Sequence, residues 1–420
     1  MEEWKEFKVG DIFHIQNGYA FKSGEFVDNS EDTYEVLKIG HIEVGGGLRS
    51  DPKRTYVKRS DKFKKWVLEK NDIVMGMTDM KSNVVILGIP ALVDKDDTYV
   101  LNQRVARLSL IDSNSFDIYF CYYQMLWNEF TSELRKTANS GVQVNLTTSG
   151  ISNTILYVPK IEIQKEIGRV LRALDDKIEC NRRINENLEQ QAQALFKSWF
   201  VDFEPFKDQP FVESELGMIP QKWRVQEAQE VFSINIGKTP PRKESEWFTV
   251  SSEDNVWVSI ADMGSCGTFI SDSSEYLTDE AVKRFNIQMV EKDSILLSFK
   301  LTVGRVAIAD TRLTTNEAIA RFILPEKSYR EFLYLYLKQY KYGNLGSTSS
   351  IATAVNSKTI KGMKLLIPNA EVIERFNENT RPLFEQIRTI QQESRRLAEL
   401  RDALLPKLMS GELKVENVTF

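Results

Sequence analysis

Two pairs of polar loops in this sequence are rich in side chains that can donate and accept the hydrogen bonds by which base edges are recognised. Asn and Gln can form two hydrogen bonds with adenine, and Arg and Lys can do so with guanine. The loops are 77–83 matched with 298–305, and 140–145 matched with 348–356. For any single residue an ordinary polar loop tip is the better interpretation, because few interface side chains read bases. As matched sets the loops favour base recognition, and the candidates are Lys81, Ser82, Asn83, Gln143, Asn145, Lys300, Thr302 and Arg305.

A third pair of loops occupies the same place in two repeated segments but shares little sequence. Residues 18–22 read Gly-Tyr-Ala-Phe-Lys, and residues 237–243 read Gly-Lys-Thr-Pro-Pro-Arg-Lys. A fixed scaffold that carries two specificities is expected to combine a constant framework with variable loops. The candidate DNA-binding residues in this pair are Lys22, Lys238, Thr239, Arg242 and Lys243.

The strongest local positive charge lies in residues 53–70, where eight Lys and Arg residues accompany only Asp61 and Glu69. Cations of this density can neutralise DNA phosphates, which adds affinity without sequence information. A solvated face of a helix or hairpin explains the same pattern equally well. The candidate phosphate-binding residues in this stretch are Lys62, Lys64 and Lys65.

The framework around these loops is repeated along the chain. The matched positions, first half against second, are Trp4, Phe13 and Gly18 with Trp223, Phe232 and Gly237; Asp72 and Met75 with Asp293 and Leu296; 102–107 with 316–321; and Ile151 and Pro159 with Ile360 and Pro368. Asn102 and Asn316 begin strands of the same pattern, so we interpret them as structural turn residues, with Arg107 and Arg321 on a framework face.

A long heptad pattern follows each repeated segment. In residues 161–200 and 370–410, apolar residues recur at alternating steps of four and three, which predicts two long helices that pack against each other. Asn181 and Asn185 interrupt the first seam, and polar seam residues usually fix register or partner. The apolar seam residues are Ile167, Leu171, Leu174, Ile178, Leu188, Ala192, Leu195 and Trp199 in the first helix, and Phe376, Leu383, Ile387, Ile390, Leu397, Leu404 and Leu408 in the second.

These patterns predict an α+β chain with an internal pseudo-twofold repeat, in which two similar mixed α/β domains are joined by an antiparallel coiled coil. The expected parts are domain 1 at 1–160, long helix 1 at 161–200, a semi-extended linker at 201–222, domain 2 at 223–369, long helix 2 at 370–410 and a tail at 411–420. Within domain 1 we expect strands at 35–39, 72–75, 84–87 and 104–108, and a helix at 116–134.

Composition and missing motifs favour binding over catalysis. The 420 residues include 42% hydrophobic and 27% charged side chains, with a net charge of −5, so a uniformly basic nucleic-acid binder is disfavoured. Three scattered cysteines and two histidines give no disulfide framework or metal spacing, and a cytoplasmic location is expected. No phosphate-cradling or nucleophile motif is found, so no catalytic residue, metal or cofactor is expected on this chain.

Three segments are similar to the conserved segments of type I restriction-modification specificity (S) subunits, and the half-repeat organisation resembles that family over the whole chain. The segments are 194–203, 216–220 with Trp223, and 404–412. The resemblance implies a non-catalytic, DNA-binding subunit of an adenine-N6 methyltransferase, with S-adenosylmethionine on the partner. It also implies two methyltransferase (M) subunits, restriction (R) subunits in the full complex, and one half of a bipartite target per domain, with the spacer set by the helices.

Two alternatives stay open. An interaction scaffold could use the helical pair to hold two protein-binding domains without touching DNA. A nuclease with its own active site ranks third, because no carboxylate cluster in the sequence requires it.

Overall fold

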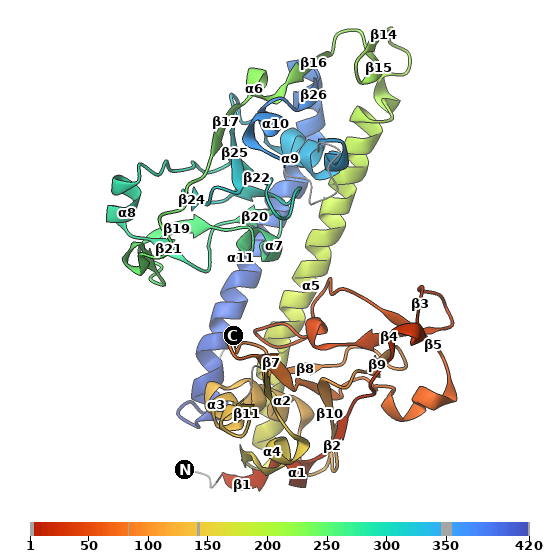
Figure 1. The fold of residues 1–420 in the computed structure, drawn as a ribbon, viewed down its shortest axis with the longest axis vertical. Coiled ribbons are helices and arrows are strands. Elements are labelled where there is room, and N and C mark those ends of the chain that lie inside the picture. The colour runs from red at the N-terminus through yellow and green to blue at the C-terminus, as the bar shows by residue number, and fades with distance from the viewer. Residues whose placement is uncertain (1–3, 83, 141–142, 346–354, 419–420) are drawn as a thin grey trace. The chain divides into compact units, whose positions relative to one another are not determined.

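The computed structural model describes residues 4–82, 84–140, 143–345 and 355–418. The chain divides into two compact units. The first contains residues 1–178 and 396–420, and the second contains residues 179–395. The long helices α5 (Ile161–Phe200) and α11 (Ala370–Met409) are both divided between the units (Figure 1).

The first unit combines small sheets with short helices. A two-stranded sheet pairs β1 with β13, a four-stranded sheet has the order β2-β10-β6-β8, a second has the order β3-β5-β4-β9, and a three-stranded sheet has the order β11-β12-β7. The strands are β1 (Lys5–Lys8), β2 (Phe13–Asn17), β3 (Phe26–Val27), β4 (Thr33–Leu37), β5 (Tyr56–Lys58), β6 (Ile73–Gly76), β7 (Thr78–Met80), β8 (Pro90–Leu92), β9 (Tyr99–Leu101), β10 (Val105–Leu110), β11 (Asn139–Ser140), β12 (Gln143–Asn145) and β13 (Ile155–Val158). The helices are α1 (Val9–Ile12), α2 (Ile118–Leu126), α3 (Asn128–Lys136) and α4 (Thr148–Asn153).

The second unit repeats the main sheets of the first. β16 pairs with β26, a five-stranded sheet has the order β17-β25-β22-β23-β20, a four-stranded sheet has the order β18-β21-β19-β24, and β14 pairs with β15. The strands are β14 (Phe211–Ser214), β15 (Gly217–Pro220), β16 (Arg224–Glu227), β17 (Ser233–Ile236), β18 (Phe248–Thr249), β19 (Asn255–Val258), β20 (Phe269–Ile270), β21 (Tyr276–Leu277), β22 (Ile295–Ser298), β23 (Val306–Ala309), β24 (Thr314–Thr315), β25 (Ile319–Ile323) and β26 (Lys364–Ile367). The helices are α6 (Ala228–Val231), α7 (Asp262–Ser265), α8 (Asp279–Arg284), α9 (Tyr329–Gln339) and α10 (Ser357–Lys361).

Strand register defines which residues of the two halves correspond, and it corrects two predicted matches. Arg107 of β10 is opposite Val74 of β6, and Arg321 of β25 is opposite Leu296 of β22. Val74 therefore corresponds to Leu296, so the predicted match of Met75 with Leu296 is wrong by one residue. The match of Asp72 with Asp293 is wrong by the same amount, because Ser294 holds the place equivalent to Asp72.

Two repeated residues explain why the framework is constant. A Cβ atom added to Gly18 would lie 2.1 Å from the carbonyl oxygen of Asn102, and one added to Gly237 would lie 2.0 Å from that of Asn316. Each asparagine side chain also accepts a backbone N–H two residues later, at 3.3 Å from Arg104 and 3.0 Å from Ala318. These contacts agree with the structural turn role predicted for both asparagines.

The two long helices pack antiparallel within each unit. In the first unit, Arg401 Nη1 of α11 donates to Asp175 Oδ1 of α5 at 2.7 Å. In the second unit, Asn181 Nδ2 donates to Glu393 Oε2 at 2.7 Å, and the ring of Phe200 lies 4.8 Å from that of Phe376. Partner numbers fall in α11 as they rise in α5, and both seams contribute to the cores. The predicted fold class is confirmed.

Three local predictions are wrong. Residues 84–87 form no strand, because Asp79 Oδ2 accepts the backbone N–H groups of Val85, Ile86 and Leu87 at 2.7, 2.6 and 3.2 Å and holds them in a turn. The helix predicted at 116–134 is two helices, α2 and α3, separated at Trp127, which has extended backbone angles.

The third concerns the segment predicted as a semi-extended linker. It contains a short 3₁₀ turn at Glu204–Phe206 and the hairpin of β14 and β15. Phe203 and Phe206 place their rings 5.6 and 5.0 Å from the ring of Trp223, so aromatic packing folds the segment onto the second unit.

Candidate nucleic-acid interface

Two of the predicted base-reading loops in the first unit meet in one small sheet. β7 pairs antiparallel with β12, which places Gln143 opposite Met80 and Asn145 opposite Thr78. Gln143 is exposed, whereas Asn145 Oδ1 accepts a hydrogen bond from the Thr78 hydroxyl at 2.9 Å. Two segments that are far apart in the sequence thus form one sheet. The hydrogen bond between Thr78 and Asn145 also links its two strands.

The turn after β7 carries the next candidates. Lys81 and Ser82 are exposed, and the predicted Asn83 lies outside the described residues. Asp79 fixes the backbone on the far side of this turn, as described above, so Lys81 and Ser82 project from an anchored segment. Sequence analysis missed this role of Asp79, although a single carboxylate between two apolar runs is a suitable acceptor for turn N–H groups.

The matching loop of the second unit, 298–305, is anchored by a different side chain. The buried Ser298 hydroxyl donates to the Thr302 carbonyl oxygen at 2.6 Å and accepts the Arg305 backbone N–H at 3.0 Å. Lys300 and Thr302 are exposed. Arg305 is half-buried and donates from Nη1 to the Ile260 carbonyl oxygen at 2.5 Å, which gives it a structural contact besides its predicted role.

The partner loop predicted at 348–356 falls almost entirely outside the described residues. Asn356 is described, and its side-chain oxygen accepts the Thr359 backbone N–H at 2.9 Å. It therefore caps α10 in the same way that Thr147 caps α4, by accepting the Gly150 N–H at 3.0 Å. This shared cap gives Asn356 a structural role.

The candidate lysines of the first unit lie among aromatic rings. Lys62 Nζ pairs with Glu25 and lies 4.9 Å from the ring centre of Tyr19. Lys65 Nζ lies 5.9 Å from the ring centre of Trp66, and Lys64 is exposed. Lys22, also exposed, precedes a 3₁₀ turn that contains Glu25 and donates its backbone N–H to that carboxylate at 2.8 Å. The Glu25 carboxylate thus contacts the backbone of Lys22 and the side chain of Lys62.

The basic stretch is less positive in the fold than in the sequence. Arg54 lies 3.3 Å from Glu35, Lys58 lies 4.0 Å from Asp32, and Arg59 lies 2.5 Å from Asp97. These carboxylates come from other parts of the chain, which a count within residues 53–70 cannot include. Lys64 and Lys65, both exposed, are therefore the stronger phosphate-binding candidates.

The variable loop of the second unit makes mainly internal contacts. Lys238 Nζ donates to the carbonyl oxygens of Phe285 and Asn286 at 3.3 and 3.0 Å, just beyond the end of α8. Arg242 forms two hydrogen bonds of 2.9 Å with Glu275. Thr239 donates to Glu317, and Lys243 is exposed. Lys243 is accordingly the member of this set that is best placed for DNA.

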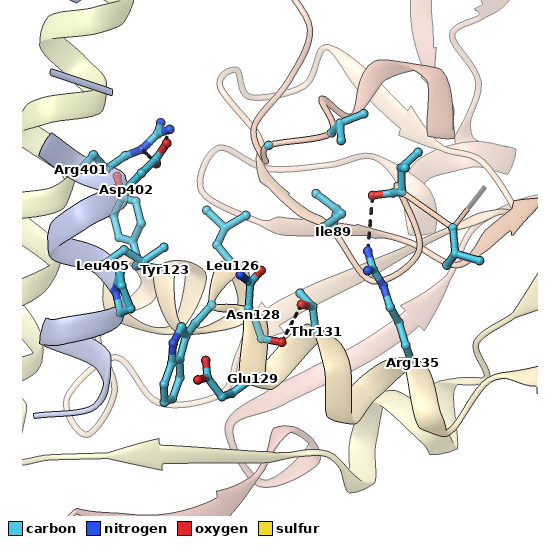
Figure 2. A pocket seen from close by; sticks show the side chains of 16 residues that line it. Ile89, Tyr123, Leu126, Asn128, Glu129, Thr131, Arg135, Arg401, Asp402 and Leu405 are labelled. Carbon is cyan, nitrogen blue, oxygen red and sulfur yellow. Dashed lines mark hydrogen bonds and ion pairs between the residues drawn. The ribbon is translucent and has the colours of Figure 1, made fainter. Parts of the chain in front are cut away.

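A cleft of about 530 Å³ in the first unit lies near the segment after β7. Figure 2 shows Arg401, Asp402 and Leu405 of α11 at one end and Arg135 of α3 at the other, with Leu126 between them. Arg135 Nε donates to the Leu87 carbonyl oxygen at 3.0 Å. Among the described residues, its lining includes none of the candidate DNA-binding side chains.

The described part of the chain contains no helix long and apolar enough to cross a membrane. Over the same residues, no group of three or more His, Cys, Asp or Glu side chains could hold a metal ion.

Comparison with known proteins assigns the chain to a family. The family model described as "Type I restriction modification DNA specificity domain" matches residues 1–190 and 220–399, one stretch in each half of the chain. The chain belongs to this family. The predicted resemblance is therefore confirmed, and the specificity subunits of type I restriction enzymes are its relatives.

Individual relatives cover most of the chain. The type I restriction enzyme HindI specificity subunit of Haemophilus influenzae is 27% identical, over 98% of this chain and 100% of its own length. The MjaIX specificity subunit of Methanocaldococcus jannaschii is 30% identical, over 71% of this chain and 70% of its own length. The crystal structure of a type I S subunit from M. genitalium matches with a TM-score of 0.54 at 15% identity, covering 97% of this chain and 96% of that one, and supports the fold alone.

Proposed function

We propose that this specificity subunit binds duplex DNA sequence-specifically, and that each unit's recognition loops read one half of a bipartite target. The observation that carries the proposal is the combination of a framework repeated in strand register with loops that share neither sequence nor anchoring side chains. Two half-sites of different sequence require this combination, because one scaffold must present two sets of base-reading groups.

The long helices set the spacer and dock the methyltransferase subunits in this proposal. α5 and α11 each span 40 residues, and each passes from one unit to the other along the sequence. A stiff helical pair fixes the separation of two recognition loops far better than a flexible linker would. Two M subunits, one per half, and R subunits in the full complex are the proposed protein partners.

Catalysis belongs to the partners in this proposal. The M subunits bind S-adenosylmethionine and methylate adenine N6, while this chain contributes DNA recognition and no catalytic residue. The assembly works on DNA in the cytoplasm.

The proposal is tested by reconstituting the full chain with its M subunits. The complex should bind target duplexes with an affinity that falls steeply as salt rises, and methylome sequencing of the host should yield a bipartite motif. Replacing either half of that motif should abolish methylation. Binding that ignores DNA sequence, together with retention of other proteins by the helical pair, would favour the alternative of a protein-binding scaffold.

A further inference from the structure

Leu301 has an unusual position at the tip of the 298–305 loop. Its side chain is 99% exposed, and its backbone φ is 61°, in the left-handed region. It lies between the exposed candidates Lys300 and Thr302. The left-handed region suits Gly, Asn or Asp and is disfavoured for a leucine. The exposed leucine also gains nothing from burial, so no contact within the protein offsets this backbone cost.

The loop around Leu301 is tied down by hydrogen bonds. Ser298 Oγ donates to the Thr302 carbonyl oxygen at 2.6 Å and accepts the Arg305 N–H at 3.0 Å. The Thr302 N–H donates to the Lys300 carbonyl oxygen at 2.6 Å, and the Gly304 N–H donates to that of Ser298 at 3.0 Å. Leu301 is therefore presented outward by a backbone that is already ordered before any ligand binds.

The equivalent position in the first unit has the opposite arrangement. Strand register matches Gly76 with Ser298, so the residue three positions further on is Asp79 in the first unit and Leu301 in the second. Asp79 turns its carboxylate onto its own backbone, whereas Leu301 points away from the protein. Any contact made by Leu301 thus belongs to the second half-site.

We infer that Leu301 recognises thymine in the second half-site, through contact with the thymine 5-methyl group. The thymine methyl is the apolar group that base pairs present in the major groove, and an aliphatic side chain without donors or acceptors can match it. Lys300 beside it supplies a cation for the neighbouring backbone or base. This inference rests on the proposed DNA-recognition function and assigns it a specific residue and base.

The test uses the full chain reconstituted with its M subunits and the target duplex that this complex methylates. Each thymine of the second half-site is replaced singly by deoxyuridine, which lacks only the methyl group. Wild-type binding should weaken about fourfold at one position, as expected for one buried methyl group. Leu301→Ala should bind thymine and deoxyuridine equally there. Val250→Ala removes another exposed apolar side chain of the same unit, 87% exposed, and should keep the fourfold ratio.

Leu301→Gly separates recognition from folding. Glycine adopts the left-handed region without steric cost, so the variant should unfold at a temperature a few degrees higher while losing the thymine preference. A wild-type ratio in Leu301→Ala at every thymine, or a second half-site without thymine, overturns the inference. Failure of the wild-type complex to bind any duplex sequence-specifically would instead overturn the proposed function.

Discussion

The central strands β6 and β22 are equivalent in register, yet both of their ends are held differently. Before β6, Asp72 pairs with the framework Arg107, whose Nε lies 2.8 Å from Asp72 Oδ2. Before β22, the acidic residue is Asp293, one position earlier, and it pairs with Arg330 and Arg388 at 2.8 and 2.6 Å. The two halves therefore share the pairing of their backbones, whereas different side chains hold the ends of these strands in each half.

The largest expected effect comes from the shared framework. Gly18→Ala and Gly237→Ala each push a Cβ atom into a backbone carbonyl that cannot move aside, so each should destabilise its own unit by about 3 kcal/mol or more. Denaturant unfolding, with hydrogen exchange assigning the transition to a unit, measures this. Gly24→Ala and Gly343→Ala, whose Cβ atoms would meet nothing within 4 Å, are the controls. If the two substitutions lowered the free energy of unfolding by clearly different amounts, the two glycines would not have equivalent roles in the two halves.

The second expected effect concerns the turn before β22, where Asp293 pairs with two arginines. Burial raises the pKa of Asp293, but hydrogen bonds from Arg388 and Arg330 outweigh it, so the net pKa lies below the ordinary value of 3.8. Asp293→Asn should cost about 2 kcal/mol at pH 7, because it removes a charged acceptor from both guanidinium groups. Arg330 keeps Glu331, and Arg388 keeps Asp310.

The sign of the pH dependence follows from that lowered pKa. The stabilisation by Asp293 is complete above the unfolded-state pKa and is lost as the pH falls through the lower, folded-state pKa. The stability difference between wild type and Asp293→Asn should therefore be constant above about pH 5 and should begin to shrink below about pH 4. Unfolding free energies measured between pH 7 and 3 check this, with the exposed Asp208→Asn as the control. A constant difference over the whole range would show that the charge is not the cause.

The third expected effect separates the two loop anchors. Asp79→Ala removes the acceptor of four backbone N–H groups and should cost about 1–2 kcal/mol, whereas Ser298→Ala should cost about 1 kcal/mol. Methylation of duplexes altered in one half-site at a time should show Asp79→Ala affecting the first half-site and Ser298→Ala the second. Loss of discrimination in the same half-site by both variants would contradict one half-site per unit.

Periodicity and repeated residues predicted the large-scale fold, because they report backbone geometry directly. The heptad seams predicted both long helices, and Gly18 with Asn102 marked a backbone contact that the second half repeats. Loop anchoring was missed, since Asp79 acts on residues several positions away that look like a strand. The register of Asp72 against Asp293 also failed, because two like residues one position apart satisfy the same sequence pattern.

The candidate site was predictable in place but not in detail. The loops around Lys81 and Gln143 were selected as separate segments, and only strand pairing shows that β7 and β12 form one surface. Lys238 and Arg242 are of types that often bind DNA. In the structure, however, Lys238 donates to the Asn286 carbonyl oxygen, and Arg242 donates to the Glu275 carboxylate. Residue type therefore locates a binding loop, while three-dimensional neighbours decide which of its side chains are exposed.

The smallest expected effect on stability, within about 0.5 kcal/mol, is that of removing exposed cations from the first unit. Lys64 and Lys65 are exposed, whereas Lys62 is paired with Glu25 and cannot release a counterion as fully when DNA binds. If Lys64 and Lys65 contact phosphates, changing both to Gln should lower the slope of log K against log salt by about 2, for every DNA sequence alike. Salt titrations with target and unrelated duplexes measure both slopes.

Lys62→Gln is the matched control for this double variant, and it should lower the slope by less than about 1, since Glu25 already neutralises the lysine. The comparison is sharp because all three lysines belong to one 3₁₀ turn, Asp61–Trp66, and differ mainly in this carboxylate. An altered target preference in the double variant would make Lys64 or Lys65 a base-reading residue. A larger slope change for Lys62→Gln would show that Glu25 releases its lysine to DNA, and the phosphate contact of the first unit would then have to be reassigned to Lys62 beside the ring of Tyr19.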